Sequence, residues 1–411
     1  MHEQDFSKTV RLYYEDSEMK EFTGRVVSCE PAGDIWHIVL DRTAFFAEGG
    51  GQAGDVGELI WGAGCTDREA ADEFTASNGC RTARVLDTHE KGGIIIHYTD
   101  APIEAGSTVT GKLNWDVRFD RMQQHSAEHI ISGLICQKFG YSNVGFHVGD
   151  DRTTLDFNGP VSAADLSNIE LRANNIIYKR MPIKTFFPTK EEEKSLNYRS
   201  KIEIEGQVRI VQIDGVDICA CCAPHVKDTG EIGIIKIIDA VNYKGGTRVS
   251  IVCGLRALRD YADRLSAVRE ISEMLSAPQA GVSQAVAELK SLSESRKSDI
   301  ISWQDKYVSL LPMCEAGEVL LRFEEKLDMD AARKYVNAGA AAGAIVAAIF
   351  VGNDETGYHY CICSESIDII AFTKTMNGAL CGKGGGKPPM TQGSVGAGKE
   401  AIKNYFQLNL S

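Results

Sequence analysis

The sequence predicts an α+β protein with four parts: an N-terminal small β-barrel, an α+β core, a long helical linker and a C-terminal α/β domain. Three observations indicate this fold class. Short β-prone runs dominate the first part, helical and strand patterns mix in the second, and two long apolar helical stripes precede a second mixed segment. We expect the four parts to span residues 1–113, 114–254, 255–311 and 312–411.

The first part contains short runs rich in branched and aromatic residues, separated by turns rich in Gly and Asp. Such runs are typical of short strands that are joined by tight connections. They lie at residues 24–28, 36–40, 83–86 and 94–98. This spacing predicts a small barrel.

The second part begins with the clearest helix signal in the chain. Apolar residues recur at helical spacing between Asn114, a good N-cap residue, and Gly140, a typical helix terminator. We expect a second helix at 163–178 and strands at 208–213 and 232–238. Helices and strands that pack together in this order predict an α+β core.

The first helix carries His125 and His129, which are four residues apart and therefore lie on one face. Their Cβ atoms would be about 5–6 Å apart, so both rings could reach one metal ion at about 2.0–2.1 Å. Two unrelated histidines, one exposed and one buried, would show the same spacing. The pair therefore indicates a metal site only together with further ligands.

Such ligands occur later in the chain, in the segment Cys219-Ala-Cys221-Cys222-Ala-Pro-His225. This segment could build a structural zinc site from its own thiolates, or it could contain ordinary buried cysteines. Counting ligands favours one Zn²⁺ shared by the set His125, His129, Cys221 and His225. Four protein ligands are typical of a structural zinc, so catalysis would require a displaced ligand or a fifth position.

The third part shows two apolar helical stripes, interrupted around Pro278 and Gly281. The first stripe runs from Leu255 to Leu275 and the second from Val286 to Leu310. Two long helices could pack against each other as a hairpin or against a second subunit. The pattern itself does not choose between the two arrangements.

The fourth part has strand patterns at 319–323, 344–351 and 358–363 and helix patterns at 329–342 and 367–380. The segment Cys381-Gly-Lys383-Gly-Gly-Gly386-Lys387 follows. Glycines with lysines are a weak phosphate-binding signal, and a flexible turn explains them equally well. The region is nevertheless a basic island in an acidic chain, with the cations Lys374, Lys383, Lys387, Lys399 and Lys403.

Composition limits the class of protein. The chain has 411 residues, 43% of them hydrophobic, and a net charge of −13, so binding of nucleic acid would rest on local basic surfaces. The most apolar stretch, 340–351, is too short to span a membrane, and the N-terminus lacks the apolar core of a secretory signal. We expect a cytoplasmic protein whose twelve cysteines are free thiols or metal ligands.

Four motifs together resemble the editing domain of alanyl-tRNA synthetases and the freestanding alanyl-tRNA editing proteins of the AlaX group. They are Leu12-Tyr-Tyr-Glu-Asp16, Asp41-Arg-Thr-Ala-Phe-Phe-Ala-Glu-Gly-Gly-Gly-Gln52, His125-Ser-Ala-Glu-His129, and Cys221-Cys-Ala-Pro-His225 with Thr229-Gly-Glu-Ile-Gly233. Their order and spacing match the family over most of the chain. In this chain Cys222-Ala-Pro224 stands where the family often has Gly-Gly-Thr.

The resemblance implies a zinc-dependent hydrolase that edits in trans and that forms a homodimer through the helical region at 255–311. Its expected substrate is alanine tRNA mischarged with serine, with glycine as a second candidate. Thr43 would hydrogen-bond the serine hydroxyl, although ordinary strand packing would also explain this residue. Gly49, Gly50 and Gly51 would let the backbone approach the terminal nucleotide.

The glycine-rich segment near the end resembles a motif in the C-terminal domain of alanyl-tRNA synthetases and of DHH-family phosphoesterases. The resemblance implies tRNA binding by Lys374, Lys383, Gly384, Gly385, Gly386 and Lys387. A phosphoesterase is disfavoured because the chain contains no Asp-His-His triplet. A non-catalytic tRNA-binding module with a structural zinc is the stronger alternative to an editing enzyme.

Overall fold

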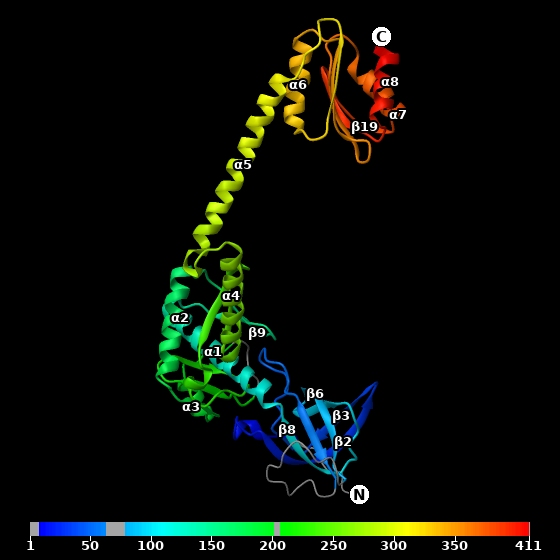
Figure 1. The fold of residues 1–411 in the computed structure, drawn as a ribbon. Coiled ribbons are helices and arrows are strands. Elements are labelled where there is room, and N and C mark those ends of the chain that lie inside the picture. The colour runs from blue at the N-terminus through cyan, green and yellow to red at the C-terminus, as the bar shows by residue number, and fades with distance from the viewer. Residues whose placement is uncertain (1–7, 63–78, 201–205, 411) are drawn as a thin grey trace. The chain divides into compact units, whose positions relative to one another are not determined.

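The computed structural model describes residues 8–62, 79–200 and 206–410 (Figure 1). The chain separates into two compact units, Met1–Ala267 and Val268–Ser411. The first unit contains a barrel and a mixed α+β region, and the second contains an α/β sheet. The predicted fold class is thereby confirmed at this level, whereas the four domain boundaries remain a prediction.

The barrel is closed by six antiparallel strands. Their order is β2 (Glu21–Ala32), β3 (Ile35–Leu40), β7 (Ile94–Thr99), β6 (Arg81–Lys91), β5 (Gly57–Trp61) and β8 (Thr108–Leu113). Alternate side chains such as Val26, Leu59 and Val85 point inward and form its core. A short parallel pair, β1 (Val10–Arg11) with β4 (Arg42–Thr43), and the turn η1 (Leu12–Tyr14) lie beside it.

The central helix α1 (Trp115–Phe139) has the predicted ends. The side chain of Asn114 accepts a hydrogen bond from the amide of Val117, and Gly140 closes the helix in the left-handed conformation. Most of α1 is buried because it contacts the barrel loops, a sheet and a second helix. This position explains why polar residues of α1, the two histidines included, lie in the interior.

The elements around α1 form one apolar core. A four-stranded sheet has the order β14 (Ile235–Tyr243), β15 (Gly246–Cys253), β10 (Thr153–Phe157) and β9 (Asn143–Val148). A three-stranded sheet consists of β11 (Ile183–Phe186), β12 (Ile210–Ile213) and β13 (Asp217–Ala220), and the smaller elements are α2 (Ala163–Tyr178), α3 (Lys190–Ser195) and η2 (Thr229–Ile232). The helix predicted at 163–178 is confirmed.

Two long helices follow, as predicted: α4 (Gly254–Met274) and α5 (Val282–Leu310), separated by the turn η3 (Gln279–Gly281). Helix α4 begins directly after β15, so its first turns belong to the first unit. Along α5, apolar residues including Leu289, Ile300 and Trp303 are exposed. Self-association through this region remains a prediction.

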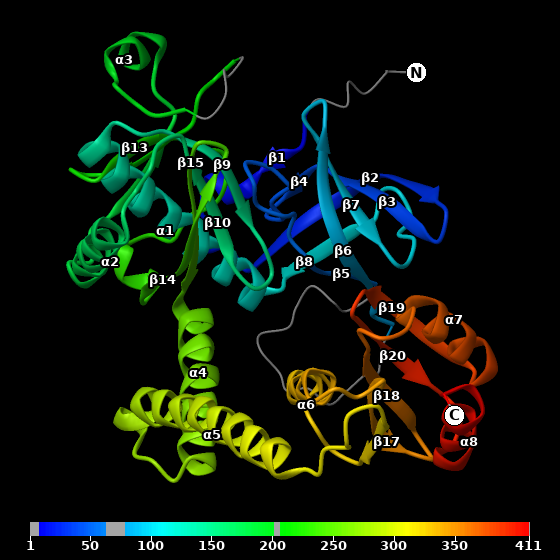
Figure 2. The same cartoon turned by 90° about the horizontal axis from the view of Figure 1, so that it is seen from above.

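The second unit contains a five-stranded sheet in the order β16 (Val319–Glu324), β17 (Val346–Asn353), β18 (Gly357–Cys363), β20 (Met390–Val395) and β19 (Gly382–Lys387). The pair β16–β17 is parallel and the others are antiparallel. Figure 2 shows α6 (Met329–Ala341) on one face and α7 (Ile369–Ala379) and α8 (Lys399–Leu410) on the other. Each face has its own apolar layer.

The glycine-rich segment is neither a turn nor a phosphate loop before a helix. It forms β19, an edge strand that pairs with β20 along its whole length. The expectation of a flexible turn was therefore wrong. Glycine is required here because a Cβ at Gly384 would lie 2.4 Å from the carbonyl of Gln392 and 2.5 Å from the Tyr360 hydroxyl.

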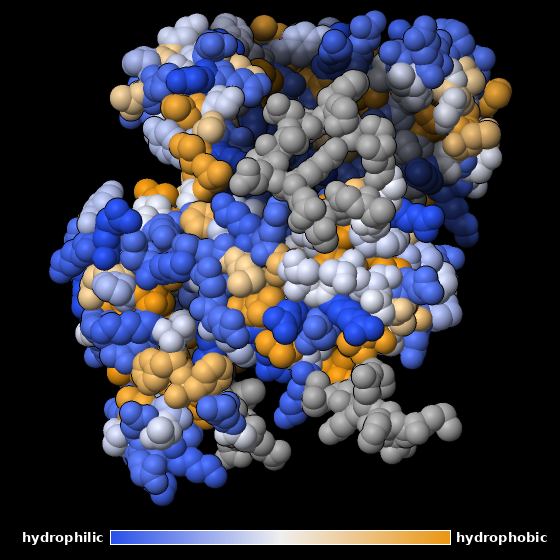
Figure 3. Space-filling model, turned by 90° about the horizontal axis from the view of Figure 1, so that it is seen from below, coloured by the Kyte–Doolittle hydropathy of each residue, from blue (hydrophilic) through white to orange (hydrophobic). Residues whose placement is uncertain are grey.

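The visible surface carries mainly hydrophilic residues (Figure 3). In Figure 3 hydrophobic residues are scattered among hydrophilic ones on the visible face. Among the helices within the described ranges, none combines the length and apolarity needed to cross a membrane. Ten of the described cysteines are free, whereas Cys80 is disulfide-bonded, so the expectation of a free thiol or metal ligand was wrong for Cys80.

Candidate metal centre

Four side chains from two separate segments converge beside the middle of α1. Helical spacing places His125 and His129 on one face, and the segment after β13 brings Cys221 and His225 to the same point. One ligand atom from each residue lies within 4.8 Å of all the others. The Sγ atom of Cys221 is 3.4 Å from Nε2 of His125 and 3.4 Å from Nε2 of His225.

These distances fit a zinc ion. Bond lengths of about 2.0–2.1 Å to nitrogen and 2.3 Å to sulfur, at tetrahedral angles, separate ligand atoms by about 3.4–3.6 Å. His125, His129 and His225 are buried, and Cys221 is partly exposed. The donor set and its spacing therefore suit Zn²⁺ better than Mg²⁺ or Ca²⁺, which prefer oxygen ligands.

The other ring nitrogen of each histidine has a partner that sets its orientation. Nδ1 of His125 lies 3.0 Å from the amide oxygen of Gln52, and Nδ1 of His129 lies 2.8 Å from a carboxylate oxygen of Asp217. Both oxygens can only accept, so they select the tautomer that carries the proton on Nδ1. The Nε2 lone pairs are thereby left for a metal. Nδ1 of His225 lies 3.0 Å from the hydroxyl of Ser126.

The charges around the ligands favour a cation. Burial works against ionisation of Asp217, yet hydrogen bonds from His129 and Arg199 lower the pKa of this carboxyl overall. The guanidinium of Arg199 donates to both oxygens, at 2.7 and 2.8 Å. Burial raises the pKa of the Cys221 thiol strongly, so a thiolate at this position would depend on a bound cation.

Sequence reasoning did not name Glu128 as a site residue, since it directly precedes His129 and neighbouring residues point about 100° apart on a helix. The fully buried carboxylate accepts hydrogen bonds from Ser132 and Asn143, both at 2.6 Å, and its second oxygen lies 3.8 Å from Nε2 of His129. It therefore reaches the metal side of the ring. Gln52 and Asp217 were also missed, although Gln52 directly follows the triple glycine.

The glycine loop predicted to approach a nucleotide lies at this centre. A Cβ at Gly49 or Gly50 would be 3.7 Å from Sγ of Cys222, and one at Gly50 would be 4.0 Å from the His125 ring. Gly51 has a φ of +83°, and its Cβ would lie 2.5 Å from the carbonyl of Phe146. Only glycine fits at this last position, so the loop lies directly against β9 at Phe146.

Buried ionic contacts tie this loop to α1. The carboxylate of Asp55 bonds the guanidinium of Arg118 and accepts from the amide of Phe46 at 2.7 Å. Both charged side chains are almost completely buried. Arg121 donates to the carbonyl of Gly54 at 2.6 Å. These contacts fasten the glycine loop to α1.

Thr43 is placed differently from the glycines. Its fully buried hydroxyl lies 2.8 Å from Nε2 of His97 and accepts from the amide of Phe45 at 3.1 Å. Nδ1 of His97 lies 3.0 Å from the carbonyl of Ile38, so Nε2 accepts and the Thr43 hydroxyl donates its proton to it. The hydroxyl is thus engaged inside the barrel.

The residues predicted to bind tRNA are divided between the two faces of the second unit's sheet. Lys383, Gly385 and Lys387 alternate along β19 and pair with Ser394, Gln392 and Met390. Lys383 and Gly384 line an open hollow of about 630 Å³ together with Arg333 of α6 and His359 of β18. Lys374 lies on α7, which packs on the opposite face (Figure 2).

Comparison with known proteins places this arrangement in a family. Residues 208–250, which include Cys221 and His225, match the threonyl and alanyl tRNA synthetase second additional domain. Alanyl-tRNA editing protein AlaX-L of Pyrococcus horikoshii is 30% identical over 310 residues, 72% of either chain. Alanyl-tRNA editing protein Aarsd1 of Mus musculus is 27% identical over 304 residues, 70% of this chain and 68% of its own.

A longer relative is the alanine–tRNA ligase of Ignicoccus hospitalis, which is 28% identical over 313 residues. The match covers 74% of this chain and 32% of the ligase, so the chain spans about a third of that enzyme. The coverage of AlaX-L is balanced between the two chains. The chain therefore belongs to the family of AlaX-type alanyl-tRNA editing proteins.

Proposed function

We propose that the protein is a zinc-dependent aminoacyl-tRNA deacylase that removes serine from mischarged alanine tRNA, with glycine as a second candidate. The observation that carries this proposal is the convergence of His125, His129, Cys221 and His225 in a chain of the AlaX family. A synthetase pocket cannot fully reject amino acids that differ by one small group, so a second hydrolytic sieve is needed. The relatives named as editing proteins support this role.

In the proposed site the four residues hold Zn²⁺, and Gln52, Asp217 and Ser126 keep the three imidazoles oriented. When bound, Zn²⁺ supplies Lewis-acid chemistry that polarises an ester or activates water. Glu128 accepts hydrogen bonds from Ser132 and Asn143, which hold its carboxyl group beside His129.

The glycine loop would receive the terminal adenosine. Gly49 and Gly50 place bare backbone beside His125 and Cys222, where it could contact the terminal nucleotide directly. Thr43 would influence serine recognition through this loop, because its hydroxyl fixes the backbone at Phe45, shortly before the glycines. The zinc site would read only the charged 3′ end.

The remaining tRNA contacts are proposed for the second unit, at Lys374, Lys383, Gly384, Gly385, Gly386 and Lys387. The exposed edge strand and the hollow beside it support phosphate contacts there. We further propose that the protein acts in the cytoplasm as a homodimer. The exposed apolar residues of α5 support self-association.

One observation favours a second candidate function. All four ligand positions are filled by protein side chains, which is the usual pattern of a structural zinc. The protein would then bind tRNA and leave the ester intact.

The rate at which the protein releases the amino acid from serine-charged and from alanine-charged alanine tRNA distinguishes the two functions. An editing enzyme releases serine much faster than alanine, whereas a binding module releases neither above the spontaneous rate. Asp217→Asn should weaken zinc binding about 10- to 100-fold and slow release at limiting zinc, because the amide no longer compensates the His129 proton. The exposed His147→Ala variant is the matched control and should behave like the natural protein.

A further inference from the structure

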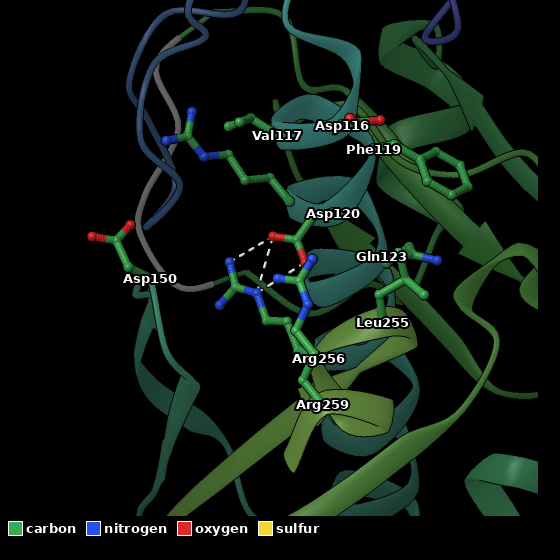
Figure 4. A pocket seen from close by; sticks show the side chains of 10 residues that line it. Asp116, Val117, Phe119, Asp120, Gln123, Asp150, Leu255, Arg256 and Arg259 are labelled. Carbon is green, nitrogen blue, oxygen red and sulfur yellow. Dashed lines mark hydrogen bonds and ion pairs between the residues drawn. The ribbon is translucent and has the colours of Figure 1, made fainter. Parts of the chain in front are cut away.

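A pocket of about 470 Å³ lies outside the metal centre, between the first turns of α1 and of α4. Three arginines line it, and Figure 4 shows two of them, Arg256 and Arg259, extending from α4. The third, Arg121, comes from α1. The pocket lies within the first unit, so it belongs to the same compact body as the metal centre.

The three arginines differ in the hydrogen bonds that their guanidinium groups make. Arg256 donates to both oxygens of Asp120, at 2.6 and 2.9 Å, and to the carbonyl of Gly149 at 2.6 Å. Arg121 uses one nitrogen for the carbonyl of Gly54. Arg259 is exposed, and no ion pair or hydrogen bond engages it within residues 8–62, 79–200 and 206–410. The guanidinium of Arg259 is therefore available for an outside anion. The guanidinium of Arg121 has N–H donors besides the one that bonds Gly54.

The backbone adds to this positive potential. Both α1 and α4 begin at the pocket, and the N-terminal end of a helix carries a partial positive charge. The opposing charges are Asp116, Asp120 and Asp150. Asp120 is neutralised by Arg256, whereas Asp116 and Asp150 are exposed at the rim.

The position of the pocket suggests which anion it takes. Arg121 precedes His125, a proposed zinc ligand, by four residues, which is an axial rise of about 6 Å along α1. This arginine therefore lies about one helical turn from a proposed zinc ligand, on the same helix. Arg121 also bonds Gly54, at the end of the loop that contains the triple glycine. An RNA strand whose last nucleotide lies at the metal centre would bring a preceding phosphate here.

We propose that this pocket binds a backbone phosphate of the acceptor strand, just before the terminal nucleotide, with Arg259 and Arg121 as the contacting residues. This inference rests on the proposed function, because it takes the metal centre as the place of the charged 3′ end. The contact carries no sequence information and sets the register of the strand. The protein thereby distinguishes a charged tRNA from a free aminoacyl ester.

The test uses the full protein and two substrates, serine-charged alanine tRNA and 3′-seryl-adenosine, which lacks phosphate. Arg259→Gln should raise KM for the tRNA about twofold to fivefold, the range of one exposed ion pair. It should leave kcat and the hydrolysis of seryl-adenosine unchanged. Arg172→Gln, an exposed arginine on α2 away from the pocket, is the matched control and should change neither.

Binding of uncharged alanine tRNA gives a readout that does not depend on hydrolysis. The slope of log affinity against log salt should fall by about 0.7–1 in Arg259→Gln. The double variant Asp116→Asn, Asp150→Asn should change affinity in the opposite direction, because it removes the two rim charges. An unchanged slope and affinity in both variants would overturn the proposal.

Inorganic phosphate separates the RNA backbone from a free anion. Calorimetric binding of phosphate that is lost in Arg259→Gln, with KM for tRNA unchanged, would assign the pocket to free phosphate and refute the proposal. A natural protein that hydrolyses neither substrate refutes the proposed function. A protein that hydrolyses both, with no effect of Arg259→Gln on tRNA binding, refutes only the phosphate pocket.

Discussion

The candidate metal centre and the lysine-bearing surface of the second unit differ in how their residues are held. At the metal centre each histidine is buried and has a partner at Nδ1. In the second unit Lys383 and Lys387 are exposed on an edge strand, and Lys374 lies on a helix of the opposite face. The candidate metal ligands are thus fixed in the core, whereas the lysines proposed to contact tRNA lie at the surface, where electrostatic contact needs no fixed geometry.

The largest expected effect concerns the buried ion pair that joins the glycine loop to α1. Arg118→Ala leaves the buried Asp55 carboxylate without its cation and should lower the free energy of unfolding by about 3–5 kcal/mol. Zinc binding should weaken as the loop loosens. Urea unfolding and zinc titration measure both effects.

The control comes from the other region. Lys403 and Glu400 form an exposed pair on α8, so Lys403→Ala should cost about 0–1 kcal/mol. Equal losses in the free energy of unfolding for Arg118→Ala and Lys403→Ala would contradict the contrast between a buried candidate metal centre and an exposed surface.

The next effect is a pH dependence of the barrel. Burial lowers the pKa of His97 to about 4 from its ordinary 6.5, even though its hydrogen bond to Ile38 opposes the shift. Between pH 6.5 and 4 the unfolded chain binds a proton that the folded barrel excludes, so stability falls as pH falls. The loss amounts to about 3 kcal/mol when the whole shift is traversed.

Urea unfolding between pH 4.5 and 7 tests this. His97→Gln keeps a donor for Ile38 and an acceptor for Thr43 but cannot titrate, so it should lose less stability on acidification than the natural protein. The same pH slope in both proteins would exclude His97 as the cause.

A smaller effect is expected for Thr43→Val, which keeps the volume and removes the hydroxyl. Stability and the discrimination between serine-charged and alanine-charged tRNA should each fall by about 0.5–1.5 kcal/mol, the net contribution of one hydrogen bond. Zinc content should stay the same. A lower stability with an unchanged serine-to-alanine rate ratio would confine Thr43 to the barrel core.

The smallest effect per residue belongs to the second unit. Lys383→Gln with Lys387→Gln should weaken binding of uncharged alanine tRNA and reduce its salt slope by about 1.4–2, because two fewer counterions are released. Lys399→Gln with Lys403→Gln is the matched pair on α8, where Lys403 already pairs with Glu400. Equal losses in the two double variants would show that general charge matters and the edge strand does not.

The sequence predicted α1 almost to the residue and brought its two histidines to one face. Both follow from local rules, a side-chain cap, a glycine terminator and a period of four residues. The convergence with Cys221 and His225 was inferred from ligand chemistry. Local rules succeed where the interacting groups lie on one helix. Ligand chemistry succeeds where distant groups are of types that bind the same ion.

The parts that the sequence did not reveal depend on contacts between distant segments. Gln52 and Asp217 act on rings of α1 from the barrel loop and from β13, and no spacing rule connects them. The glycine-rich segment resembled a turn, yet pairing with β20 makes it a strand. Glycine has a low strand propensity, and here close packing on Gln392 and Tyr360 overrides it.

The central claim is that one zinc ion is shared by two segments and is required for hydrolysis. The most direct measurement is zinc content together with release of serine from charged alanine tRNA, for the natural protein and for Cys221→Ala, His225→Ala. We predict about one zinc per chain in the natural protein, and loss of both zinc and hydrolysis in the double variant. Full zinc occupancy in the double variant, or hydrolysis that persists without zinc, would contradict the account.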